Sequence, residues 1–229
     1  MKAVVTGASS GIGFEISKML ITLGYEVFGI GRDFSKIEYD DEKFIKIESD
    51  LSKKNEILKL KKLKNISILV NSAGVGYFGG HEQLSIENIQ EMIQVNLTAP
   101  LIISRLFLND LKKNSGYIFN INSISALKPA IFGAVYGASK AGLRHFGNSL
   151  FNEARKSGLK VVNINPDITK TAWFDNLNFS YSDDPQSYIE PKSIAKLIKN
   201  IIELGDNTVI SDITIEPQKF QLKKKTNYN

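Results

Sequence analysis

The sequence predicts an α/β fold: one domain built on a doubly wound parallel β-sheet with helices on both faces. Three observations predict it. Short apolar runs alternate with longer amphipathic segments along most of the 229 residues. Runs such as residues 66–70 show little polar alternation, which is typical of strands buried on both faces of a sheet. A glycine-rich loop follows the first run directly, at the place where such sheets bind ligands.

Aliphatic and β-branched residues fill the expected strands, and apolar residues at helical spacing mark the expected helices. The strands are expected at 2–6, 25–30, 43–48, 66–70, 116–121, 159–164 and about 208–215. The helices are expected at 12–23, 52–63, 85–112, 135–156 and 192–204. Crossovers of this length favour the strand order 3-2-1-4-5-6-7, which opens a ligand crevice beside the first strand.

One segment, residues 166–191, does not follow the alternation, because it combines prolines, aspartates and a cluster of aromatic residues. A segment of this length without regular structure is usually functional, and here it predicts a lid over the crevice; a short helical excursion is the alternative. The domain is therefore expected to span residues 1–217, and residues 218–229 are expected to form a polar basic tail.

Composition excludes several classes of protein. The chain has no cysteine, which rules out disulfides, thiolate metal sites and a cysteine nucleophile, and His81 and His145 lack partners at metal spacing. The net charge of +5 is carried mostly by scattered lysines without a nucleic-acid-binding motif, so no nucleic acid is expected. No signal peptide or membrane-spanning run is found, which predicts a cytoplasmic protein with no membrane partner.

The loop after the first strand reads Thr6-Gly7-Ala8-Ser9-Ser10-Gly11-Ile12-Gly13. A glycine at the strand end permits a tight turn, a second lets the backbone approach a pyrophosphate, and a third lets the helix pack against the sheet. The helix that follows directs its free N–H groups and positive dipole end at that phosphate. The position of the loop, between the first strand and the first helix, predicts dinucleotide binding.

This glycine spacing resembles that of the short-chain dehydrogenase/reductase family, whose fold is Rossmann-like, and the resemblance extends from residue 2 to about 217. Asn71-Ser72-Ala73-Gly74 is similar to the family's Asn-Asn-Ala-Gly signature, with serine in second place. Asp50 matches the carboxylate that receives the adenine amino group, although it could instead be a turn residue before a helix. The remaining matches are to the family's catalytic set: Asn96, Ser123, Tyr136 and Lys140.

The Tyr-x-x-x-Lys pattern alone decides nothing, because it occurs three times, at Tyr39/Lys43, Tyr136/Lys140 and Tyr188/Lys192. Context favours the second pair. Tyr136 and Lys140 open a long helical pattern, in which i,i+4 spacing puts both side chains on one face. The third pair is interrupted by Pro191, which is disfavoured inside a helix.

The resemblance implies the following roles. Tyr136 is the general acid/base, and Lys140 lowers its pKa and binds the nicotinamide ribose. Ser123 holds the substrate oxygen as charge develops on it, with Ser125 as a nearby rival. Asn96 holds a water that links Lys140 to solvent, unless it only caps or kinks its helix.

The nicotinamide cofactor is expected to be NADP(H), with NAD(H) as the alternative. Gly31 stands where an acidic residue would receive the ribose hydroxyls, and Arg32 beside it suits a 2′-phosphate. If the Asp33 carboxylate turned inward, NAD(H) would compete. The expected cofactor contacts are Gly7, Ser9, Ser10, Gly11, Ile12, Gly13, Arg32, Asp50, Leu51, Asn71, Ala73, Gly74, Tyr136, Lys140, Pro166, Ile168 and Thr171.

The expected activity is the interconversion of a carbonyl and an alcohol on a small substrate, such as a 3-hydroxy acid or a related polar carbonyl compound. Asp167 replaces the family's glycine after Pro166, which puts a carboxylate near the crevice mouth, where it could orient a polar substrate or only cap the loop. The alternatives are a 3-oxoacyl-thioester reductase and a dinucleotide-binding regulator without turnover. By resemblance, helices 85–112 and 135–156 are expected to pair across a homodimer or homotetramer.

Overall fold

The computed structural model describes residues 1–175, 177–205 and 208–225. A seven-stranded parallel sheet has the order β3-β2-β1-β4-β5-β6-β8. This confirms the predicted fold and spatial order; the last sheet strand is β8 because a short lid strand, β7, precedes it in the chain. The sheet strands are β1 Lys2–Thr6, β2 Glu26–Gly31, β3 Phe44–Glu48, β4 Ile66–Asn71, β5 Tyr117–Ile121, β6 Lys160–Pro166 and β8 Asp212–Ile215.

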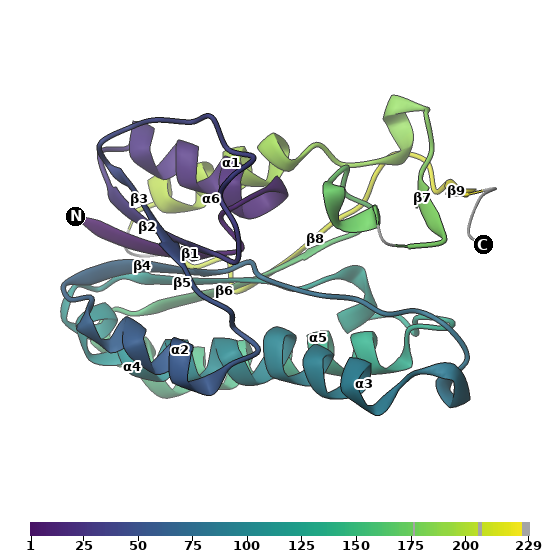
Figure 1. Cartoon of the computed structure of the whole chain (residues 1–229). Coiled ribbons are helices and arrows are strands. Elements are labelled where there is room, and N and C mark those ends of the chain that lie inside the picture. Colours follow the sequence, from purple (N-terminus) through teal and green to yellow (C-terminus); the bar gives the residue numbers. More distant parts are fainter. Residues whose placement is uncertain (176, 206–207, 226–229) are drawn as a thin grey trace.

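Helices cover both faces of the sheet (Figure 1). One face carries α1 Gly11–Thr22 and α6 Pro191–Glu203, and the other carries α2 Lys54–Lys59, α4 Ala99–Lys113 and α5 Ala134–Ala154. Successive strand residues alternate between the two cores: in β5, Ile118 packs with Phe107 of α4, whereas Phe119 packs with Ile198 of α6. Both faces are therefore buried, which explains the nearly unbroken apolar runs of the strands.

The prediction of one continuous helix over residues 85–112 is wrong in detail. The chain instead forms α3 Ile86–Ile93, a π-helical turn Gln94–Thr98 and then α4. Pro100 has no N–H to donate to the carbonyl of Asn96, so the regular hydrogen-bond pattern cannot continue through it. The helix expected over 52–63 is shortened as well, because α2 passes into a 3₁₀ turn at Leu60–Lys62.

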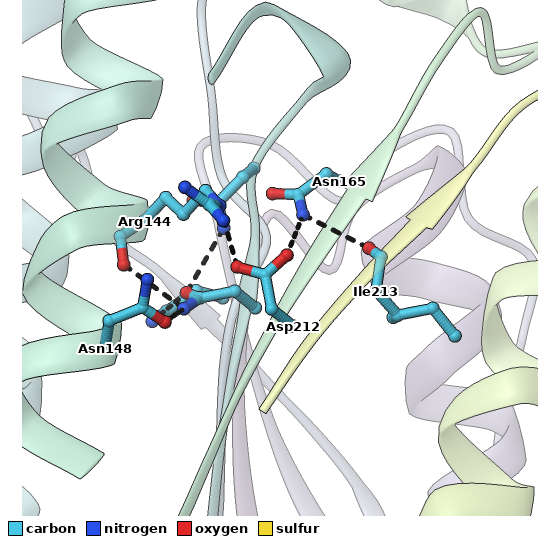
Figure 2. Close-up of polar contacts among 8 residues, drawn as sticks. Arg144, Asn148, Asn165, Asp212 and Ile213 are labelled. Carbon is cyan, nitrogen blue, oxygen red and sulfur yellow. Dashed lines mark hydrogen bonds and ion pairs between the residues drawn. The ribbon is translucent and has the colours of Figure 1, made fainter. Parts of the chain in front are cut away.

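A row of buried asparagines crosses the sheet and holds α5 in place. Asn71, Asn120 and Asn163 lie in register on β4, β5 and β6. Asn71 Nδ2 donates to Asn120 Oδ1 at 2.9 Å, and Asn120 Nδ2 donates to Asn163 Oδ1 at 3.2 Å. Asn163 Nδ2 then donates to Asn148 Oδ1 at 2.8 Å and to the Arg144 carbonyl at 3.1 Å, both on α5 (Figure 2).

Beyond this row, Arg144 forms an ion pair with Asp212 of β8, with Nε and Oδ2 2.7 Å apart, and Asp212 accepts from Asn165 of β6 at 2.7 Å (Figure 2). The same helix carries Tyr136 and Lys140 one to three turns earlier. The polar contacts between α5 and the sheet therefore fix the position of the residues expected to be catalytic.

The lid and the C-terminal segment are joined, which the sequence did not indicate. Strand β7 Phe179–Tyr181 lies in the lid and pairs antiparallel with β9 Leu222–Lys224. Residues 222–224 are thus not a separate tail, and residues 226–229 of the expected tail lie outside the described residues. Among the described residues, no helix is long and apolar enough to cross a membrane.

Candidate active site

A cleft of about 1580 Å³ lies at the carboxyl ends of the strands, where the sequence predicts the ligand crevice. The glycine loop and the end of β2 line one part of it. Tyr136, Lys140 and the lid aromatics Trp173 and Phe174 line the other. Of the expected site residues, all but Asn71 and Asn96 line this cleft.

The glycine loop is packed so closely that side chains do not fit at its turns. Gly7 has φ +67°, and a Cβ there would lie 2.9 Å from the backbone of Ala73. A Cβ on Gly13 would lie 2.3 Å from the carbonyl oxygen of Gly7, so α1 begins directly against the strand end. Thr6 Oγ1 accepts from the N–H groups of Ser72 and Ala73 at 3.0 and 3.1 Å, which joins β1 to the loop after β4. The close packing of the first helix against the strand end, expected of the third glycine, is observed.

Tyr136, Lys140 and Ser123 meet at the start of α5. All three side chains are buried, with 9%, 4% and 9% of their surface exposed. Lys140 Nζ donates to the carbonyl of Ile121 at the end of β5 at 3.0 Å, and it lies 5.9 Å from the centre of the Tyr136 ring. Ser123 stands two residues beyond that strand end, where its Oγ accepts from the N–H of Ser125 at 3.1 Å. The chain thus brings a phenol, an amine and a hydroxyl to one side of the cleft.

Burial controls the protonation of this group. Loss of water around the phenol raises the pKa of Tyr136 to about 12, although a hydrogen bond with Ser123 partly opposes the rise. Burial also lowers the pKa of Lys140 to about 8, because the charged amine loses solvent. The expected lowering of the Tyr136 pKa by Lys140 is therefore not found here; burial raises this pKa instead.

Asn96 lies behind Lys140, on the π-helical turn. It is fully buried, and its side chain exchanges hydrogen bonds with the backbone of Val75, donating at 2.8 Å and accepting at 2.9 Å. Asn96 Nδ2 also donates to Ser139 Oγ, which in turn donates to the carbonyl of Tyr136 at 2.7 Å. A Cβ on Gly74 would lie 3.3 Å from Lys140 Nζ and 3.4 Å from Asn96 Oδ1, so this glycine separates the two residues.

At the other end of the cleft, Arg32 follows β2 directly and is exposed. The carboxylate of Asp33 does not turn inward: it accepts from the N–H and hydroxyl of Ser35 at 2.7 and 2.9 Å. These hydrogen bonds lower the pKa of Asp33, the backbone bond most strongly. Asp50 lines the cleft but also accepts from the N–H and Oγ of Ser52, so the turn considered as its alternative role is present.

Asn71 is an expected cofactor contact whose side chain does not line the cleft. Its side chain is buried in the asparagine row and lies outside the cleft lining. Several residues that line the cleft carry no signal in the sequence. Tyr77 and Glu91 line the cleft and are joined by a hydrogen bond of 2.6 Å, and Leu222 and Lys224 of β9 line it near the lid. No local pattern signals β9, because its partner β7 is about forty residues away.

Aromatic residues of the lid segment and of neighbouring loops pack around Tyr136. The ring centres of Trp173 and Phe78 lie 5.6 and 5.4 Å from that of Tyr136. Phe174 and Phe179 extend this cluster at 5.1 Å from Trp173 and 5.3 Å from Phe78. These rings exclude water from the phenol, which is the physical cause of its raised pKa. Phe132 also lines the cleft but is 67% exposed.

The arrangement defines a class of protein. The cleft combines a glycine loop that admits a pyrophosphate, a helix that begins at that loop and a buried Tyr/Lys/Ser group. These features suit a dinucleotide-dependent oxidoreductase. The family described as short chain dehydrogenase matches residues 1–181, and the chain belongs to this family. It is an NAD(P)-dependent oxidoreductase that acts on CH–OH groups.

Relatives agree with this assignment. An uncharacterized oxidoreductase of Staphylococcus saprophyticus is 31% identical, over 94% of this chain and 96% of that protein. The alcohol dehydrogenase from the archaeon Thermococcus sibiricus, complexed with 5-hydroxy-NADP, shares the fold with a TM-score of 0.85 at 23% identity, over 96% of this chain and 98% of that one. A 4-hydroxyisoleucine dehydrogenase complexed with NADH has a TM-score of 0.81 at 26% identity, over 94% and 97%.

Proposed function

We propose that this protein is an NADP(H)-dependent oxidoreductase that interconverts a carbonyl and an alcohol on a small polar substrate of the 3-hydroxy-acid type. The observation that carries the proposal is the buried group of Tyr136, Lys140 and Ser123 beside the glycine loop. The polar residues at the mouth, Asp167 among them, favour a polar substrate over a purely apolar one.

In this proposal, Tyr136 donates its proton to the substrate oxygen during reduction and takes it back during oxidation. Ser123 donates a hydrogen bond to the same oxygen as negative charge develops on it. Lys140 and Asn96 are positioning residues for the phenol. Lys140 holds the end of β5 through the Ile121 carbonyl, and Asn96 holds the turn of Tyr136 through Ser139.

The cleft fits the cofactor through the glycine loop, where added Cβ atoms would collide with backbone. The free N–H groups at the start of α1 would hold the pyrophosphate. When bound, NADP(H) supplies or accepts the hydride. The residues proposed to contact it are the glycine-loop residues Gly7, Ser9, Ser10, Gly11, Ile12 and Gly13, together with Arg32, Asp50, Leu51, Ala73, Gly74, Tyr136, Lys140, Pro166, Ile168 and Thr171.

The preference for NADP(H) rests on Arg32 and Asp33. Arg32 lines the cleft, whereas the neighbouring Asp33 carboxylate accepts hydrogen bonds from Ser35 and does not line it. One observation favours NAD(H) instead: Arg32 shares a side pocket with the carboxylates of Glu48 and Asp50. The ratio of kcat/KM for NADPH and NADH tests this. We expect NADPH to be preferred and the preference to fall in Arg32→Ala; a preference for NADH in the unaltered protein would refute it.

Catalysis is tested by NADPH oxidation with a panel of aldehydes, ketones and oxo acids, for the unaltered protein and for Tyr136→Phe. We expect turnover that the substitution removes, because phenylalanine keeps the ring packing but has no proton to donate. Turnover that survives in Tyr136→Phe would refute the mechanism. No turnover with any substrate would favour a regulator, and preference for a carrier-linked thioester would favour an oxoacyl-thioester reductase.

We also propose that the protein is a homodimer or homotetramer paired through α4 and α5. Among the apolar residues of these helices, Leu143 and Leu150 are buried within the chain, whereas Leu106 and Phe146 are half-buried. The half-buried residues still expose apolar surface that a second copy of the chain would cover. Light scattering coupled to size-exclusion chromatography measures the mass directly, and the mass of a single chain would contradict the proposal.

A further inference from the structure

The C-terminal segment, defined as residues 218–225, is held firmly against the lid. In the β7–β9 pair, Phe179 lies opposite Lys224 and Ser180 opposite Lys223. Backbone hydrogen bonds extend the contact at both ends, from Lys219 N to the Gln186 carbonyl at 2.9 Å and from Lys225 N to the Asn178 carbonyl at 3.0 Å. The segment therefore has a defined place next to the substrate end of the cleft.

Ion pairs fix the outer side of this segment. Lys219 Nζ lies 3.0 Å from Asp184 Oδ2, and Lys223 Nζ lies 2.7 Å from Asp183 Oδ2. Because side chains alternate along a strand, Lys223 points to one face of β9, while Leu222 and Lys224 point to the other. Leu222 and Lys224 line the cleft, whereas Lys223 does not.

Lys224 is a lysine at this end of the cleft that forms no ion pair with another residue that the structure describes. Lys128 and Glu216 also line the mouth, but they pair with each other at 3.1 Å. The half-buried carboxylate of Asp167 accepts from the N–H of Ile168 at 2.8 Å. Within residues 1–175, 177–205 and 208–225, no ion pair involves Lys224.

We infer that β9 is part of the substrate site and that Lys224 selects substrates carrying a carboxylate away from the reacting carbon. The amine offers a positive charge at the mouth, and the aromatic lid gives the rest of the substrate an apolar wall. This inference rests on the proposed function, because it assigns the substrate class of that site. A lysine binds such a group as a point charge, so a charge-neutral analogue of the same shape loses the attraction.

Binding can be measured without turnover, because Trp173 is the one tryptophan of the chain and lies in the lid. Its fluorescence is titrated with pentanoate and, separately, with pentanamide, with no cofactor added. We expect pentanoate to bind about tenfold more tightly than pentanamide. Lys224→Gln should abolish this preference, and the matched control Lys223→Gln should retain it, because that lysine faces away.

Turnover provides a second readout through the ratio of kcat/KM for 4-hydroxypentanoate and its methyl ester. Lys224→Gln should lower this ratio about tenfold, and Lys223→Gln should leave it unchanged. Three outcomes would overturn the inference. They are equal binding of pentanoate and pentanamide by the unaltered protein, no measurable pentanoate binding, and a preference that survives in Lys224→Gln. Selective pentanoate binding without any turnover would support the inference and contradict the proposed function, so the two failures are distinguishable.

Discussion

Replacing Lys140 by methionine should stabilise the protein at neutral pH while removing its activity. Lys140 is 4% exposed, and burial lowers its pKa from 10.5 to about 8. Below pH 8 the amine is charged in both the folded and the unfolded chain, and a pKa change of this size then destabilises the fold by about 3 kcal/mol. Methionine has a similar length but no charge. It loses the hydrogen bond to Ile121, worth about 1 kcal/mol, so Lys140→Met should gain about 2 kcal/mol.

The stability gained by Lys140→Met should decrease as the pH rises. Between about pH 8 and 10.5, the unfolded chain binds the Lys140 proton and the folded chain does not, so the unaltered protein becomes more stable as pH rises. Lys140→Met lacks this effect, and its advantage should largely disappear by about pH 9.5. Urea unfolding at pH 7 and at pH 9.5 measures both free energies of unfolding.

Lys196→Met is the matched control, because Lys196 is exposed on α6 and should show no such pH dependence. The reasoning would be refuted if Lys140→Met were less stable than the unaltered protein at pH 7. A stability difference that stayed constant between pH 7 and 9.5 would refute it as well, since the cause would then not be the charge.

Three other substitutions test the loop, the asparagine row and the site. Gly13→Ala places a methyl group 2.3 Å from the Gly7 carbonyl oxygen, so we expect a loss of about 2 kcal/mol in urea unfolding and at least a tenfold rise in the Kd for NADPH. Asn163→Ala removes a buried side chain that makes four hydrogen bonds, so we expect its free energy of unfolding to fall by about 4 kcal/mol. The matched variant Asn152→Ala, at an exposed site on α5, should lose less than about 1 kcal/mol. Ser123→Ala should lower kcat for ketone reduction about 100-fold and leave the Kd for NADPH unchanged; equal activity would contradict its role.

The sequence predicted the features that depend on local pattern. The seven sheet strands were located from apolar or alternating runs, and a doubly wound order was expected from the alternation of these strands with helical crossovers. The glycine loop was recognised because the close approach of backbone at Gly7 and Gly13 admits no side chain. Tyr136 and Lys140 were separated from two other matches because only they open a long helix.

The errors arose where tertiary contacts override local pattern. Apolar spacing runs through Pro100, so the π-helical turn was not predicted, although a proline inside a helical pattern is a signal for such a break. Asn71 was assigned to the cofactor by resemblance. Its partner Asn120 is on β5, and Asn163, which bonds Asn120, is on β6. Only the register of the sheet brings these three side chains into one row.

The raised pKa of Tyr136 has a consequence for the direction of proton transfer. With a pKa of about 12, the phenol is protonated at neutral pH, and it can donate a proton to a carbonyl oxygen without prior ionisation. To accept a proton at pH 8, the same residue would first have to ionise, which costs about 5 kcal/mol. The aromatic lid that causes this burial therefore prepares the site for reduction.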